Sequence, residues 1–160
     1  MTITHVALRY LEAFDNNGEF DGGLSFKTAL AQSNLDGSRE SLARIDTLLD
    51  QIRLRFKPDP EAYFANQAHV NFMYLLAFYV GRIVATETNS TIEWYQYDEL
   101  LELMPDHRDF FPRCFASSVS CILSRGTSQG NFFVPLSSIQ ERLFEEFPEK
   151  SVAFSTTAFM

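Results

Sequence analysis

The chain has 160 residues, of which 46% are hydrophobic and 21% are charged, and its formal net charge is −8. This composition is that of a globular domain large enough to fold without a metal or a disulfide, and it excludes a disordered chain. The surplus of acids argues against binding to nucleic acid or to an anionic membrane, because both are bound through Lys and Arg.

The first predicted element is a helix over residues 3–14, where apolar side chains recur at helical spacing. The segment 15–23 that follows alternates oxygen-bearing side chains. A calcium-binding EF-hand loop placed over it would begin at Ala13 and end at Leu24, where acids are required. We therefore expect an ordinary loop. Residues 25–32 are predicted to form either a short helix or an extended arm.

A second helix is predicted over residues 39–56, because its apolar side chains fall on one face. Ser38 or Asp36 is expected to cap the free N–H groups at its start. A third helix is expected to open at Asp59-Pro60 and to run over residues 61–86, since an acid at the cap and a proline in the first turn are typical of helix starts.

The second half of that third helix, residues 72–80, is apolar on every side. Nine residues are too few to cross a bilayer, which takes about 20, so we expect the segment to be the central packing element of the core. Gly81 weakens a helix by about 1 kcal/mol relative to Ala. Its expected use is to let another backbone or a bulky ring pack close.

The pattern changes to alternating β-branched and aromatic residues after Thr86. Strands are predicted over residues 91–97, 113–123 and 131–134, and an amphipathic helix over 135–147. Residues 98–104 are predicted as either a strand continuation or a helical turn, 105–112 as a loop and 124–130 as a polar turn. The tail, 151–160, is predicted to be either a last strand or disordered.

Helices that come first and strands that come later favour an α+β fold over a parallel βαβ sheet. We expect N-terminal helices, including one long buried central helix, packed on a small antiparallel sheet, with a C-terminal amphipathic helix. A single domain is predicted over residues 1–160. It comprises an N-terminal arm with short helices (1–34), a helical core (35–87), a strand region (91–134) and a C-terminal helix and tail (135–160).

The two cysteines, Cys114 and Cys121, are seven residues apart in a predicted strand. At about 3.3 Å per residue they would be roughly 20 Å apart, too far for a disulfide. Free thiols indicate a reducing compartment. The first ten residues lack the features of a signal peptide. We therefore expect a cytoplasmic protein.

Two stretches resemble segments of small bacterial proteins of unknown function. Residues 35–50 begin Leu-Asp-Gly-Ser-Arg-Glu-Ser-Leu, similar to a Leu-Asp-aromatic-Ser-x-Glu-Ser-Leu opening of a helix in those proteins. Residues 76–84, followed by Trp94, resemble an apolar helix that ends in Tyr-hydrophobic-Gly-Glu before a Trp-bearing strand. This chain departs at Gly37, where an aromatic residue is usual, and at Arg82, where Glu is usual. The resemblance implies an α+β fold and no particular activity.

Few side chains fall in a pattern that supports catalysis. The three histidines, His5, His69 and His107, lie outside any G-x-S-x-G context and have no zinc-ligand spacing. The glycines of residues 126–130 have no Lys nearby and are followed by a strand pattern, so a hairpin turn is favoured over a phosphate loop. We expect neither a metal nor a cofactor, and a non-enzymatic role is favoured.

Acidic side chains gather between Glu87 and Asp109, where seven acids stand against Arg108 alone, for a net charge of −6. Residues 141–149 carry four acids and Arg142, for a net charge of −3. Such surfaces attract a basic partner, although they would also serve solubility alone. Aromatic residues accompany the first run and could anchor an interface. The predicted binding residues are Trp94, Tyr95, Tyr97, Asp98, Glu99, Glu102 and Asp106.

The favoured hypothesis is therefore a bacterial immunity or adaptor-type domain that binds another, basic protein. The alternative is a small-molecule-binding domain or an unrecognised enzyme, with a pocket formed by Asn66, His69, Asn71 and Arg82 beside Trp94. A third hypothesis is a homo-oligomer, because the 16 Phe residues could cover a dimer interface as well as a core.

Overall fold

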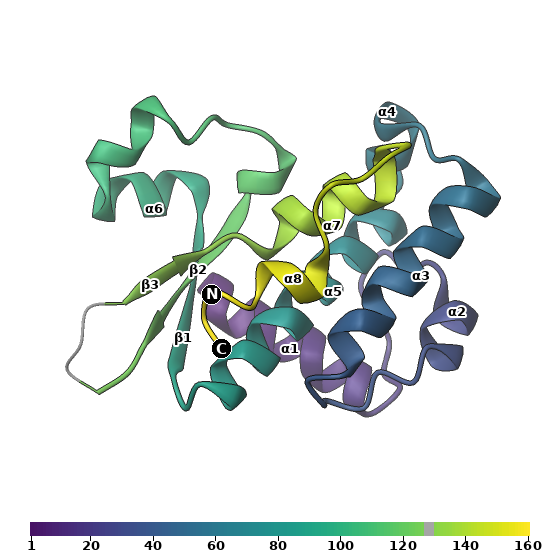
Figure 1. Ribbon diagram of the computed structural model, residues 1–160, viewed down its shortest axis with the longest axis horizontal. Helices are drawn as coiled ribbons and strands as arrows, with labels where there is room; N and C mark the ends of the chain where they lie inside the picture. The colour runs from purple at the N-terminus through teal and green to yellow at the C-terminus, as the bar shows by residue number, and fades with distance from the viewer. Residues whose placement is uncertain (127–129) are drawn as a thin grey trace.

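The computed structural model describes residues 1–126 and 130–160 and has an α+β fold (Figure 1). Its helices, in chain order, are α1 (Ile3–Asp15), α2 (Lys27–Gln32), α3 (Ser41–Phe56), α4 (Pro60–Phe64), α5 (Gln67–Glu87), α6 (Tyr97–Leu103), α7 (Pro135–Phe144) and α8 (Val152–Ser155). Two short 3₁₀-helices are η1 (Pro105–Asp109) and η2 (Phe115–Ser117). The strands are β1 (Thr91–Gln96), β2 (Val119–Ser124) and β3 (Asn131–Phe133).

The three strands form one antiparallel sheet in the order β1-β2-β3. Trp94, Cys121 and Phe133 stand opposite one another across the ladder, so all three point to the same face. All three are buried, which makes this the core face. The alternate residues, among them Ile122 and Phe132, point to the outer face. The turn predicted over residues 124–130 includes 127–129, which lie outside the described residues.

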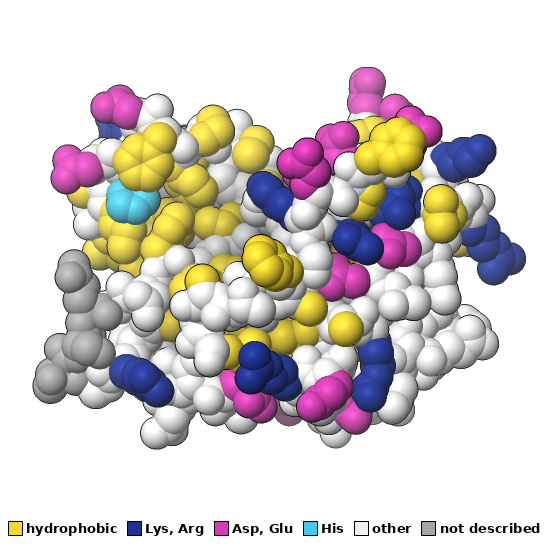
Figure 2. Space-filling view, viewed as in Figure 1, with side chains coloured by type: hydrophobic (Ala, Val, Ile, Leu, Met, Phe, Trp, Pro, Cys, Tyr) yellow, Lys and Arg dark blue, Asp and Glu magenta, His cyan; other side chains and the backbone are white. Residues whose placement is uncertain are grey.

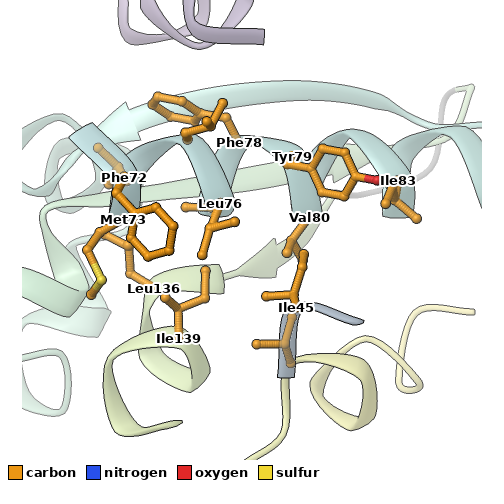
Figure 3. Packing of buried hydrophobic residues seen from close by; sticks show 14 of the residues in the cluster. Ile45, Phe72, Met73, Leu76, Phe78, Tyr79, Val80, Ile83, Leu136 and Ile139 are labelled. Carbon is orange, nitrogen blue, oxygen red and sulfur yellow. The ribbon is translucent and has the colours of Figure 1, made fainter. Parts of the chain in front are cut away.

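Helix α5 is the central element of the core, as its apolar sequence predicts. Every residue of 71–81 except Tyr74 is buried. In Figure 3, Val80 faces Ile45 of α3, while Leu76 faces Leu136 of α7. Within the described residues, α5 is the one helix long and apolar enough to cross a membrane, but 72% of its most apolar window is buried inside the protein. That burial is typical of the core helix of a soluble protein.

The helix predicted over residues 61–86 is broken in two, and that part of the prediction was wrong. Helix α4 ends at Phe64, and α5 begins at Gln67. Between them, Asn66 has an extended backbone, and its side-chain oxygen accepts the N–H of Ala68 at 3.0 Å. An Asn side chain competes for backbone N–H groups in this way, and so favours a cap over a helix interior.

The strand predicted over residues 113–123 is wrong in its first half. Cys114 caps η2 instead, and β2 begins only at Val119. The Ser117 hydroxyl accepts the N–H of Cys114 at 2.9 Å and donates to the carbonyl of Pro112 at 2.8 Å, which closes the turn. Both cysteines are free; Cys114 is exposed and Cys121 is buried, and burial raises the pKa of the Cys121 thiol.

The C-terminal tail is neither a strand nor disordered, contrary to the prediction. Its residues form α8, which packs on α3 and α7. The carboxylate of Asp46 in α3 accepts the N–H of Val152 at 2.7 Å, the N–H of Ala153 at 3.0 Å and the hydroxyl of Ser151 at 2.9 Å. A side chain from over a hundred residues earlier therefore caps this helix.

Candidate functional site

Residues 97–113, which hold α6 and η1, connect β1 to β2 and lie on the outer face of the sheet (Figure 1). Residues 98–104, predicted as either a strand continuation or a helical turn, belong mostly to helix α6, which opens with a capping box formed by Gln96 and Glu99. In it, Glu99 Oε1 accepts the N–H of Gln96 at 3.2 Å. Leu100 and Leu101 are the buried residues of α6. Apolar burial and the cap therefore hold this segment in place.

An aromatic cluster lies under η1, against the outer face of β3. The ring of Phe111 packs against Phe132 with centroids 5.4 Å apart, and stacks on Tyr97 at 5.5 Å. His107 contacts Phe132 at 5.5 Å and Phe110 at 4.9 Å. The Tyr97 hydroxyl donates to the carbonyl of Phe111 at 2.6 Å, which ties α6 to the chain after η1. The cluster gives this segment a rigid support.

Two large apolar side chains project from this support into solvent. Phe110 is 68% exposed and Leu103 is 56% exposed. Five exposed acids share the segment with two arginines, for a net charge of −3: Asp98, Glu99, Glu102, Asp106 and Asp109, with Arg108 and Arg113. Figure 2 shows hydrophobic side chains gathered over this part of the molecule, bordered by acidic ones. We call these exposed residues of 97–113 the α6–η1 surface.

The predicted binding residues divide between this surface and the interior. Trp94 is only 4% exposed and packs edge-on against Phe78 at 4.9 Å, so its proposed contact with a partner was wrong. Tyr95 is half-buried on the other face of the sheet. Its burial, followed by the charges of Glu93 and Glu99, raises the pKa of the Tyr95 hydroxyl. Tyr97 is half-buried within the aromatic cluster.

The predicted acids Asp98, Glu99, Glu102 and Asp106 all lie on the α6–η1 surface. Asp98 is paired with Arg113, whose guanidinium also lies 4.5 Å above the ring of Tyr97. Leu103 and Phe110 were missed in the sequence. A signal was available, since both are large apolar residues within an acidic run that otherwise reads as solvated.

The residues of the alternative pocket do not come together. Asn66 caps α5, and the side chain of Asn71 is buried against the loop that follows α1. Arg82 points to α1 instead, where its guanidinium forms a two-pronged ion pair with Asp15 at 2.8 and 3.2 Å. Arg82 and Trp94 do line one cavity of about 400 Å³, but neither Asn66 nor His69 reaches it.

His69 forms a close pair with Ser25, which resembles half of a hydrolytic dyad. The Ser25 hydroxyl lies 2.5 Å from His69 Nδ1, and burial lowers the pKa of the imidazole, which favours the neutral ring. The ring is stacked between Tyr63 at 4.6 Å and Phe26 at 5.4 Å. Over residues 1–126 and 130–160, no carboxylate hydrogen-bonds to the imidazole. The pair links the turn before α2 to α5.

Two further cavities flank helix α1. One, of about 350 Å³, lies between α1, α5 and the start of α6 and includes Tyr97, Asp98 and Cys114. The larger, of about 670 Å³, lies between α1, the loop after it and the start of α5. No group of three or more His, Cys, Asp or Glu side chains suited to a metal ion occurs among the described residues.

Comparison with known proteins finds no matching family model, no matching curated protein and no matching solved structure.

Proposed function

We propose that this protein is a cytoplasmic bacterial domain of the immunity or adaptor type, and that it binds another, basic protein through the α6–η1 surface. The exposure of Phe110 within a group of acids carries the proposal. The bacterial origin and the uncharacterised family follow from the resemblance of residues 35–50 and 76–84. The non-enzymatic role follows from the absence of a catalytic motif in the sequence.

A large exposed apolar side chain on a rigid support favours an interface. Leaving a Phe ring in water forgoes about 1.5–3 kcal/mol of burial free energy, which a partner could recover by covering it. Interfaces are anchored by a few aromatic side chains ringed by polar groups. Phe110 has this setting, because His107 contacts its ring and Asp106 and Asp109 are exposed nearby in the chain.

The charge of the α6–η1 surface favours a basic partner over an acidic one. Five acids against two arginines attract Lys and Arg side chains and speed their encounter. One of the acids, Asp98, is already paired with Arg113, so the exposed acids Glu102, Asp106 and Asp109 are the proposed contacts. An electrostatic contribution of this kind weakens as salt is added.

Affinity capture from the cells that make the protein tests this proposal. The tagged wild type is compared with Phe110→Ser and with the double variant Glu102→Lys/Asp106→Lys. We expect a protein with a basic contact region to be recovered with the wild type and reduced about tenfold or more with either variant, since loss of an anchor residue costs at least about 2 kcal/mol.

The matched control is Leu54→Ser on α3. The side chain of Leu54 is 70% exposed, close to the 68% of Phe110. Leu54 lies outside both acidic runs. Capture by this control should equal that of the wild type. Equal recovery of the same protein by the Phe110→Ser variant and the wild type would contradict the proposal. So would recovery that does not change between low and high salt.

A further inference from the structure

The cavity between α1 and the start of α5 is separate from the α6–η1 surface and has the size of a small-molecule site. Its volume is about 670 Å³, within the range of about 300–1,000 Å³ that is usual for ligand pockets. Helix α1 forms one wall, the loop after it forms the second and the first turns of α5 form the third. The cavity is thus an open hollow bounded by three separate segments of the chain.

The floor of this cavity is held rigidly by Asn71, which is 1% exposed. Its side-chain N–H groups donate to the carbonyls of Asp21 and Gly23, both at 2.8 Å. Its oxygen accepts from the Tyr10 hydroxyl at 2.8 Å and from Gln67 at 3.0 Å. All four hydrogen bonds available to the amide are therefore made, and they join the three walls at one point.

Aromatic rings provide the apolar part of the lining. The ring of Tyr10 meets Phe20 edge-on at 5.4 Å, and on its other side it meets Phe78 at 5.3 Å. Val6 and Ala13 of α1 add aliphatic surface. Methylene groups of a ligand would find contact on this lining without displacing any hydrogen bond within the floor.

The charged part of the lining is mainly acidic. Three carboxylates, Glu12, Glu19 and Asp21, stand against one guanidinium, that of Arg9. No ion pair within 4.0 Å occurs at any of the four in the described part of the chain, and Arg9 Nη1 lies 3.5 Å from the sulfur of Met1. Burial, then Tyr74 and then Asp21 raise the pKa of the Tyr10 hydroxyl.

We propose that this cavity binds an aliphatic polyamine, whose ammonium groups pair with Glu12, Glu19 and Asp21 while its methylene chain lies against Tyr10 and Phe20. The carboxylates stand on two different walls, Glu12 on α1 and Glu19 and Asp21 on the loop after it. Several ammonium groups joined by apolar spacers match both the charges and the lining. An organic anion is disfavoured, because its charge would face three carboxylates.

Titration of the full-length protein with spermidine tests this inference by calorimetry and by amide chemical shifts in NMR spectra. We expect saturable binding with shifts confined to residues 6–23 and 67–71. The double variant Glu12→Gln/Asp21→Asn should bind about tenfold more weakly, since each neutralised contact removes a modest share of the affinity. Both substitutions preserve side-chain shape, and the backbone carbonyl of Asp21 still accepts from Asn71.

The control variant Glu145→Gln/Glu146→Gln removes the same charge from two exposed acids far along the chain. It should bind spermidine as the wild type does. Non-saturable binding, shifts spread over both acidic runs, or equal weakening by the two double variants would show general attraction to a chain of charge −8 and overturn the inference. The wild-type shift map decides the matter even if a variant folds poorly.

Discussion

Gly81 of α5 lies directly beneath the indole ring of Trp94 on β1. A Cβ atom at position 81 would stand 2.4 Å from Cζ2 of Trp94 and 2.9 Å from Cδ1 of Ile92. Separations this short do not occur between real Cβ atoms and their neighbours. The expectation that this glycine allows a bulky ring to pack close is confirmed, and the ring is Trp94.

Gly81→Ala is therefore predicted to destabilise the protein even though Ala is the better helix former. The helix gains about 1 kcal/mol from the substitution. The added methyl group displaces a buried indole in a well-packed core, which costs about 1–3 kcal/mol or more. We expect a net loss of up to about 2 kcal/mol in the free energy of unfolding, measured by urea denaturation.

The double variant Gly81→Ala/Trp94→Phe separates this clash from any other effect of the new methyl group. The smaller ring leaves room at position 81, so Gly81→Ala should cost less in the Trp94→Phe background than in the wild type. If the cost is the same in both backgrounds, the close approach is not what requires glycine.

Asp46→Ala is predicted to release the C-terminal helix. It leaves the N–H groups of Val152 and Ala153 without their acceptor and removes the partner of Ser151. We expect a loss of about 1–3 kcal/mol and faster cleavage after residue 150 in limited proteolysis. Asp59→Ala, which removes the exposed cap of α4 on Ala62, is the control and should cost about 0.5–1 kcal/mol. Equal costs for the two variants would refute the special role of Asp46.

Asp50 is predicted to make stability depend on pH in the acid range. Its carboxylate accepts two hydrogen bonds from Arg142, both at 2.7 Å, and one from Arg53 at 2.8 Å. Burial on its own would raise the pKa of Asp50, but these hydrogen bonds outweigh it and hold the pKa below the ordinary value of 3.8. As pH falls, the unfolded chain therefore takes up this proton before the folded protein does.

The stabilisation by Asp50 is thus fully present above the ordinary pKa and is lost as pH falls through the lower pKa of the folded state. Asp50→Asn should cost about 1–3 kcal/mol at pH 7, because the ion pairs are partly buried. The difference in free energy of unfolding between the Asp50→Asn variant and the wild type should shrink below about pH 4. Urea denaturation at pH 7 and at pH 3 measures it, and a difference that is constant with pH would contradict the assignment.

Local patterns in the sequence predict the central helix because nine consecutive apolar residues leave it no polar face. They do not predict the tail, because Ser151 alone is a weak start signal for so short a helix, and the carboxylate that accepts the N–H groups of Val152 and Ala153 lies far away on α3. The alternating residues of β1 predict that the strand has two different faces, but they do not predict which face is turned to the core. Trp94 faces the core because Gly81 leaves space for its ring, which is a tertiary relationship.

The acidic character of the candidate site and the presence of Phe110 within the acidic run were readable in the sequence, but the exposure of Phe110 was not. Trp94 is the largest ring beside the acids, and it is buried. Phe110 follows η1, and its exposure depends on how η1 packs on Phe132 through His107 and Phe111. Such packing joins segments more than twenty residues apart, so helix and strand periodicity carries no information about it.

Hydrogen exchange on the purified protein, with and without its captured partner, tests whether the α6–η1 surface is the binding site. We expect the partner to slow exchange over residues 97–113, Phe110→Ser to abolish this protection, and Leu54→Ser to leave it intact. Protection confined to other regions, such as residues 141–154 or the cavity beside α1, with none over 97–113, would contradict this expectation.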